Sequence, residues 1–171
     1  MTIADKITIV SIFFGIILSG YAIYVEYQAS MNEEFEALCD FSEQVSCSKV
    51  FLSEYGKIFS KLGLVPKDSA LDLPNACFGL LFYLFYFLIY SFSRVVPYSN
   101  LLLLSMSVFS LVFSAYLAWI LATVLHEFCV VCTSTYACNF GLFVASAMSS
   151  KKSEKITGST TESKSGKKKK N

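Results

Sequence analysis

Two cysteines, Cys129 and Cys132, stand at the start of an apolar segment, residues 128–150, that contains no Asp, Glu, Lys or Arg. On a helix both sulfurs would lie on one face, because residues three apart are neighbours there. Unpaired N–H groups at a helix N-terminus stabilise a thiolate and so make the sulfur more nucleophilic. Since the segment is long enough to cross a bilayer, the sequence predicts a redox dithiol that reacts with a lipid-soluble quinone.

A second pair, Cys39 and Cys47, precedes the next apolar segment. A disulfide that only staples this loop is one interpretation, because disulfides persist in oxidising compartments. Two dithiols on one side of a membrane instead favour a relay by thiol–disulfide exchange. For Cys129 and Cys132, a structural disulfide or two inert thiols remain the alternatives.

The other two cysteines, Cys77 and Cys138, fall inside apolar segments, and we assign them no role because buried free cysteine is commonly a small hydrophobe. A zinc site needs four ligands, and the chain has a single histidine, His126. We therefore predict no metal and no haem.

The composition is that of a membrane protein. Of the 171 residues, 54% are hydrophobic and 16% are charged, too little charge for the surface of a soluble domain. Four stretches reach the roughly 20 apolar residues that a span needs; they cover about 7–25, 74–93, 100–124 and 128–149. We expect an all-α membrane protein, a four-transmembrane-helix bundle forming one catalytic domain over 1–150.

The charge distribution predicts the orientation, because Lys and Arg beside spans favour the cytosol. The tail, residues 151–171, carries eight Lys, whereas the loop 26–73 is rich in acidic residues. Both termini are therefore expected in the cytosol and the loop in the lumen. The tail is predicted to be disordered. Its end, Lys168 to Asn171, resembles the dilysine retrieval signal of endoplasmic-reticulum membrane proteins, with a polybasic contact to lipid as the alternative.

The lumenal loop is expected to carry short amphipathic helices. Asn32 is a predicted N-cap that opens a helix carrying Cys39. A second helix is predicted over 51–62, where apolar residues recur at spacings of three and four. It would lie in the membrane interface as a lid over the site, or simply pack on the bundle.

A quinone site needs hydrogen-bond donors for two carbonyl oxygens and an apolar slot. Tyr136, four residues beyond Cys132, can supply one donor. Asn75 at the start of the second span can supply another, or can cap that helix. The predicted walls are aromatic: Phe78, Phe82 and Tyr83 of the second span would form one side, or would simply pack within the bundle. Phe51 and Tyr55 of the lid are the other predicted wall residues.

These motifs together resemble the vitamin K epoxide reductase family. The resemblance runs from about Ile7 to Met148 and omits the Lys-rich tail. It rests on Ala37 to Asp40, Ser46 to Phe51, Asn75 to Gly79, Tyr116 to Leu121, and Phe128 to Cys132 with Tyr136.

The resemblance implies an endoplasmic-reticulum enzyme that reduces vitamin K 2,3-epoxide to the quinone, and the quinone to the hydroquinone, without a tightly bound cofactor. Cys132 would attack the substrate, and Cys129 would resolve the adduct. Cys47 would exchange with Cys129, and a lumenal thioredoxin-like protein would re-reduce the Cys39–Cys47 pair.

The resemblance further implies that Asn75 and Tyr136 hydrogen-bond the quinone oxygens, and that warfarin-type anticoagulants occupy the same pocket. No nucleic-acid partner is expected. The chain departs from the vertebrate pattern at Tyr55, where a Trp is usual, and at Phe41, where a smaller residue is usual. Cys77 and Cys138 replace aliphatic residues.

Two other functions remain open from the sequence. The same chemistry run in the opposite direction gives a quinone-linked oxidase that generates disulfides in lumenal proteins, because net direction depends on relative potentials. A non-enzymatic tetraspan junction-type protein, stapled by a lumenal disulfide, leaves the second dithiol unexplained.

Overall fold

The structure, a computed structural model, describes residues 2–32, 35–42, 45–57, 61, 63, 72–93 and 98–168, with side chains up to Ser150. Its elements are helices: α1 (Ile3–Met31), α2 (Cys47–Leu52), α4 (Asn75–Ser91), α5 (Ser99–Ile120), a π-helical segment (Leu121–Leu125) and α6 (Val130–Lys168). The described residues contain no β-strand beyond an isolated bridge between Ser42 and Val45. The predicted helical fold is confirmed at this level.

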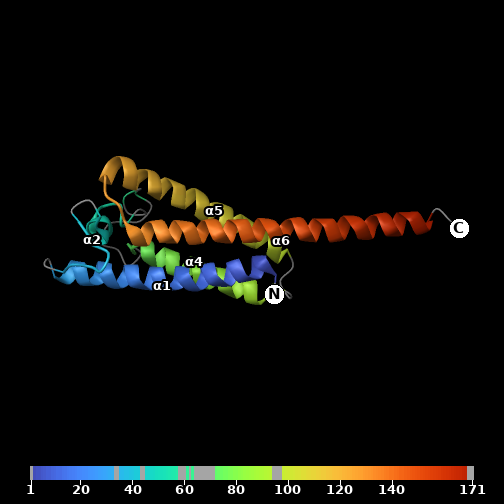
Figure 1. Cartoon of the computed structure of the whole chain (residues 1–171), viewed down its shortest axis with the longest axis horizontal. Coiled ribbons are helices and arrows are strands. Elements are labelled where there is room, and N and C mark those ends of the chain that lie inside the picture. The colour runs from blue at the N-terminus through green and yellow to red at the C-terminus, as the bar shows by residue number, and fades with distance from the viewer. Residues whose placement is uncertain are drawn as a thin grey trace.

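The four long helices run alongside one another, with α2 at one end of the bundle (Figure 1). The N-terminus lies at the other end, and α6 runs out past that same end to the C-terminus. Both termini therefore lie opposite α2.

Three segments are long and apolar enough to cross a bilayer: Ile3–Met31, Ser99–Leu125 and Val130–Ser150. The fourth, α4, is apolar but has 17 residues, about 25 Å at 1.5 Å per residue. That is shorter than the predicted segment 74–93, because the helix starts only after Pro74 and ends at Ser91.

The first helix is longer than the predicted 7–25. Thr2 caps its start: the Thr2 N–H donates to Asp5 Oδ2 at 2.6 Å, and the Asp5 N–H donates to Thr2 Oγ1 at 3.2 Å. At the other end no Gly or Pro stands between Val25 and Met31 to stop the helix.

The two helices predicted in the loop differ from those observed. Asn32 does not open a helix; it ends α1, donating its N–H to the Gln28 carbonyl at 3.0 Å, and Cys39 lies in a turn. The helix predicted over 51–62 instead begins at Cys47, because Ser46 caps it, and ends at Leu52. Residues 53–57 form a bend and a turn, and Lys61 is helical. Residues 58–60 and 62 of the predicted helix lie outside the described residues.

The α6 backbone continues beyond Ser150 as far as Lys168, and the disorder expected of the tail stays a prediction. Extending an existing helix avoids the cost of nucleation. No Pro follows Ser150 to stop it.

Close packing within the bundle relies on small residues. The main neighbours are α1 with α6, α5 with α6, and α1 with α4. A Cβ at Gly15 would overlap the ring of Tyr83, and one at Gly141 would lie 2.6 Å from Ser11 Oγ. Such residues let helices approach closely in membrane proteins.

Buried polar side chains join three of the helices. The Tyr83 hydroxyl donates to Asn139 Oδ1 at 2.8 Å, and Asn139 Nδ2 donates to Ser114 Oγ at 2.8 Å. This chain links α4, α6 and α5. Each group is satisfied inside the bundle, as hydrocarbon surroundings require.

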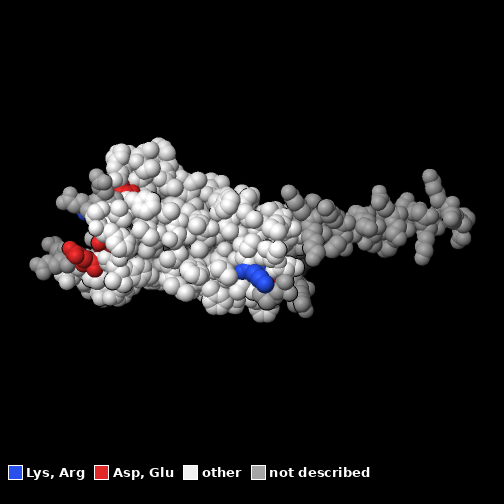
Figure 2. Space-filling view, in the orientation of Figure 1, with Lys and Arg blue, Asp and Glu red and all other residues white. Residues whose placement is uncertain are grey.

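The outside of the bundle is apolar. Large side chains that stay more than half exposed include Phe14, Phe85, Phe109, Trp119 and Phe140. On the face that Figure 2 shows, acidic residues gather at the α2 end and the long side of the bundle is largely uncharged. A continuous apolar surface of this kind suits lipid rather than water.

Candidate functional site

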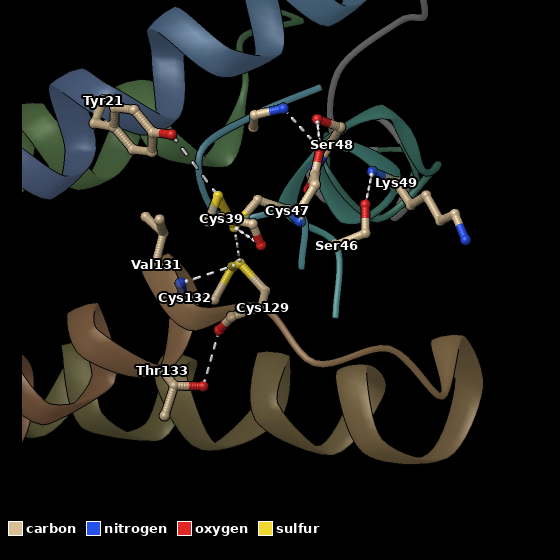
Figure 3. Close-up of a disulfide and its surroundings, with 12 residues drawn as sticks. Tyr21, Cys39, Ser46, Cys47, Ser48, Lys49, Cys129, Val131, Cys132 and Thr133 are labelled. Carbon is tan, nitrogen blue, oxygen red and sulfur yellow. Dashed lines mark hydrogen bonds between the residues drawn. A yellow bond between two sulfur atoms is a disulfide. The ribbon is translucent and has the colours of Figure 1, made fainter. Parts of the chain in front are cut away.

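The two cysteine pairs meet at the α2 end of the bundle (Figure 3). Cys39 and Cys47 form one disulfide, with Cα atoms 5.9 Å apart, and Cys129 and Cys132 form another, with Cα atoms 5.3 Å apart. The Sγ atoms of Cys47 and Cys129 are 3.8 Å apart, and both residues are fully buried. One sulfur of each pair is therefore in contact with the other pair.

The start of α6 holds Cys129 in this position. Cys129 directly precedes Val130, the first residue of the helix, and its Sγ accepts the N–H of Cys132 at 3.1 Å. Its carbonyl accepts the N–H of Thr133 at 3.0 Å. The sulfur thus takes the place of an N-cap oxygen, where helix N–H groups stabilise a thiolate. The dithiol lies at a helix start, as the sequence predicts.

Asp40 holds the other pair together. Its Oδ1 accepts the N–H groups of Cys47 at 2.6 Å and of Ser48 at 3.2 Å. Its Oδ2 accepts the Ala37 N–H at 2.9 Å and the Ser48 hydroxyl at 2.6 Å. Although burial opposes ionisation, these hydrogen bonds hold the pKa of Asp40 below its ordinary value. The carboxylate ties the turn of Cys39 to the N-terminus of α2.

An ion pair connects α2 to the segment before Cys129. Lys49 Nζ lies 3.8 Å from Glu127 Oε1. The preceding residue, His126, has a φ of 53°, a left-handed conformation that turns the chain from the π-helical segment toward α6. Because the junction between the π-helical segment and α6 is short, this ion pair keeps α2 close to the start of α6.

A cavity adjoins the dithiol on the side of Cys132. Four of the six predicted substrate-binding residues line it with Cys132: Asn75, Tyr136, Phe51 and Tyr55. The other two, Phe78 and Phe82, line a neighbouring apolar cavity between α4 and α5, which shares Asn75 and Tyr136. The predicted aromatic wall is therefore divided between two adjoining cavities.

Asn75 has a partner that its sequence position does not reveal. Pro74 occupies the N-cap position of α4, so Asn75 is not the cap. Its Nδ2 donates to the Tyr55 carbonyl at 2.6 Å, and its N–H donates to the Gly56 carbonyl at 2.8 Å. Asn75 thereby fastens the turn after α2 over the start of α4.

Tyr136, unlike Asn75, has a side chain whose polar group is not engaged by the turn after α2. It is half-buried in the cavity wall, and its hydroxyl forms no hydrogen bond with any residue that the structure describes. It lies one helical turn beyond Cys132 on α6. A donor in that position can reach an oxygen of a molecule held beside the Cys132 sulfur.

Two residues of the site escape sequence reasoning. Asp40 counts in the sequence only as one acidic loop residue, because two of its three amide partners, Cys47 and Ser48, lie seven and eight residues away at no characteristic spacing. Glu26 counts as the first residue of the loop, whereas α1 continues past it and buries it to 8% exposure in the cavity wall. The available signal in the sequence was that Glu26 continues the spacing of four residues between buried positions of the first span, as from Ala22 to Glu26.

One group in the described part of the chain has atoms grouped closely enough for a metal: Cys39, Asp40 and Cys47. Both of its sulfurs are joined in a disulfide, and the Asp40 oxygens accept hydrogen bonds. While the disulfide is closed, this donor set does not fit a metal ion, because cysteine binds metals as the thiolate.

Comparison with known proteins gives matches over most of the chain. A sequence model described as the vitamin K epoxide reductase family matches residues 6–147. Vitamin K epoxide reductase complex subunit 1 of Rattus norvegicus is 40% identical over 133 residues, which are 77% of this chain and 81% of the relative. The Mus musculus protein of the same name matches with the same identity and coverage. The matched residues include both disulfides and the cavity beside them.

Proposed function

Since the chain belongs to the vitamin K epoxide reductase family, a family of oxidoreductases, we propose that it reduces vitamin K 2,3-epoxide to the quinone, and the quinone to the hydroquinone, with thiols as the electron source. The observation that carries the proposal is the 3.8 Å contact between the Cys47 and Cys129 sulfurs beside a cavity that Cys132 lines. One dithiol then faces the substrate and the other supplies it with electrons.

The substrate step uses Cys132 and Cys129. The Cys132 thiolate attacks an epoxide carbon, the carbon–oxygen bond opens, and the oxygen takes a proton. Cys129 then attacks the Cys132 sulfur, so that the disulfide forms and the electron pair of the carbon–sulfur bond stays with the ring. The ring expels the oxygen as water. In total one dithiol and one epoxide give one disulfide, one quinone and one water.

The relay step restores the dithiol. A Cys47 thiolate attacks Cys129, forming a Cys47–Cys129 disulfide and releasing the Cys132 thiolate. Cys39 then attacks Cys47 and releases Cys129. Attack on a disulfide requires a sulfur within reach of the bond, and the buried 3.8 Å contact supports this order.

A lumenal thioredoxin-like protein is the proposed reductant of the Cys39–Cys47 pair. Apolar side chains flank Cys39: Leu38 is 86% exposed and Phe41 is 73% exposed. Exposed apolar residues beside a disulfide offer a binding surface to a protein partner.

The cavity supports the proposed substrate class. Tyr136 and Asn75 are the proposed donors to the quinone oxygens, and Phe51 and Tyr55 are the proposed ring contacts. The adjoining apolar cavity with Phe78 and Phe82 suits a hydrocarbon side chain. Warfarin-type anticoagulants are proposed to compete for the same space.

We place the chain in the endoplasmic-reticulum membrane with four spans, which are the three long apolar helices and the shorter α4. The domain is 1–150, the loop between α1 and α4, residues 32–74, is lumenal, and both termini are cytosolic. Three long apolar helices support membrane insertion. The position of both termini at the end opposite α2 supports an even number of spans (Figure 1).

The proposal is tested with purified protein, vitamin K epoxide and dithiothreitol. Cys132→Ala and Cys129→Ala should each abolish turnover, because neither the adduct nor its resolution can form. Cys39→Ala and Cys47→Ala should lose much more activity with a thioredoxin-like protein reductant than with dithiothreitol, since a small reductant bypasses the relay.

Cys138→Ala is the matched control. It removes a free thiol from the same helix and should leave turnover unchanged. Turnover retained in Cys132→Ala would refute the mechanism. Oxidation of substrate proteins without opening of the epoxide would identify a quinone-linked oxidase instead.

A further inference from the structure

Glu26 is a buried acid in the cavity that holds Cys132. It lies near the end of α1 and is 8% exposed. Among the described residues that line this cavity, it is the one with a carboxyl group. Burying a carboxyl in a largely apolar wall is costly, and neither the relay nor the proposed substrate contacts use it.

Glu26 also lines a second, outer cleft. Among described residues, Glu26 and Phe51 line both the Cys132 cavity and this cleft. Because Phe51 cannot ionise, Glu26 is the titratable group at the boundary. The outer cleft is otherwise rich in charge, with Glu54, Lys57, Lys61 and Asp72 among its lining residues.

The charged groups near Glu26 are therefore on the outer side. Lys57 Nζ lies 3.6 Å from Asp72 Oδ2, and both act electrostatically on Glu26. The Cys77 thiol at the start of α4 also lies within the electrostatic range of Glu26. Glu26 therefore lines a polar cleft on one side and the cavity of Cys132 on the other, so a proton on its carboxyl can exchange with water in the cleft and with groups in the cavity.

The chemistry requires such a group. A thiol must lose its proton to attack, and the opened epoxide oxygen must gain one. When the dithiol closes, the Cys129 proton must also reach that oxygen before it leaves as water. Both protons come from the thiols, so a carrier between sulfur and oxygen returns to its starting state after each turnover.

We propose that Glu26 is this proton carrier, acting between the Cys132 dithiol and the substrate oxygen. The inference rests on the proposed function. The Glu26 carboxylate takes the Cys132 proton as the thiolate forms, gives it to the oxygen as the carbon–oxygen bond opens, and then repeats the transfer with the Cys129 proton. The outer cleft keeps the carboxyl in exchange with bulk water between turnovers.

The test compares pH profiles of kcat for wild type and Glu26→Gln, with vitamin K epoxide and dithiothreitol. The kcat of wild type should have a bell-shaped pH profile, because the active form carries one proton between the Cys132 thiol and the Glu26 carboxyl. In Glu26→Gln, kcat at pH 7 should fall by about 100-fold or more. Its profile should become a single rising limb that reports the thiol alone.

Two further variants separate a proton role from a structural one. Glu26→Asp keeps the acid and should keep the bell at lower kcat. Glu36→Gln changes an exposed acid of the loop that follows α1 and should match wild type. Mapping of the disulfides checks that each variant retains the native pairs.

The outcomes distinguish this inference from the proposed function. No epoxide turnover in wild type would refute the function itself. Turnover with a wild-type profile in Glu26→Gln would overturn the inference alone. If Glu26→Gln loses the native disulfides, the wild-type profile and Glu26→Asp decide: a wild type without the descending alkaline limb, or a Glu26→Asp variant without the bell, overturns it.

Discussion

The Asp40 carboxylate acts on the proposed relay through the backbone. It binds the N–H groups of Cys47 and Ser48 at the start of α2 and that of Ala37 before Cys39. An anion at a helix N-terminus stabilises the helix and satisfies its unpaired amides. At the scale of single residues, Asp40 therefore keeps the two sulfurs of the loop pair close when their disulfide is open.

Replacing Asp40 with Ala should loosen the loop and leave the substrate dithiol intact. Hydrogen bonds to a charged group contribute about 1.5–3 kcal/mol each, so the cost should be large for so short a segment. We expect strongly reduced turnover with a protein reductant and near-normal turnover with dithiothreitol. Glu36→Gln, at an exposed acid of the same loop, is the control. Equal losses with both reductants would contradict this role.

The protection of the Cys47 and Ser48 amides against hydrogen exchange should also depend on pH. Because the folded pKa of Asp40 is lowered, its stabilisation is complete above the ordinary carboxyl pKa of about 4 and is lost as the pH falls through the lower folded value. Hydrogen exchange of the Cys47 and Ser48 amides, corrected for intrinsic rates, should report this loss. Protection that is constant down to pH 2 would show that other contacts hold the loop.

At the scale of elements, the packing of α1 against α4 sets the width of the cavity. Gly79 of α4 faces Ser19 of α1, where an added Cβ would lie 3.2 Å from the Ser19 Oγ, and both residues line the cavity. Farther along the same interface, the Tyr83 ring lies against Gly15. A side chain at Gly15 would push Tyr83 away from Asn139, its hydrogen-bond acceptor on α6.

Gly15→Ala should therefore destabilise the bundle, by about 1–3 kcal/mol as for other overpacked cores. Gly20→Ala on the same helix is the control, because an added Cβ there meets no atom within 4 Å. It should be neutral, or stabilising by up to about 1 kcal/mol from helix propensity. Thermal unfolding in detergent, followed by the emission of Trp119, measures both. Equal midpoints for the two variants would contradict the packing argument.

At the scale of the whole molecule, the site lies at the end opposite both termini, where the loop from α1 to α4 meets the start of α6 (Figure 1). Cys39 is reached through a loop with exposed apolar residues, and Cys132 lines a cavity inside the bundle. The buried contact of Cys47 with Cys129 lies between them. This order is the one that the proposed relay requires, from a water-soluble reductant to a lipid-soluble acceptor.

Much of this arrangement was predictable because it depends on local patterns. Apolar length predicts the long helices, and the position of Cys129 before an apolar run predicts a dithiol at a helix start. The short helix expected at Cys39 was wrong, since the capping signal at Asn32 competes with continuation of α1 to Met31. Tertiary contacts, here those of Asp40, fix that turn.

Other features have no local signal. From a spacing of three residues, Cys129 and Cys132 cannot be told apart. The fold distinguishes them, because Cys129 contacts Cys47 and Cys132 lines the cavity. The burial of Glu26 likewise depends on where α4 and the turns after α2 pack against α1. Long-range packing therefore decides the separate surroundings of residues that are equivalent in the sequence.

The most direct test of the relay is to trap its intermediate. In the Cys39→Ser, Cys132→Ser double variant, the remaining relay sulfurs are Cys47 and Cys129, which lie 3.8 Å apart. Mass spectrometry after blocking of free thiols should find the Cys47–Cys129 disulfide as the main species. The matched Cys39→Ser, Cys129→Ser variant should instead leave Cys47 and Cys132 as free thiols. Absence of the Cys47–Cys129 disulfide, or equal formation of Cys47–Cys132 in the control, would contradict the relay.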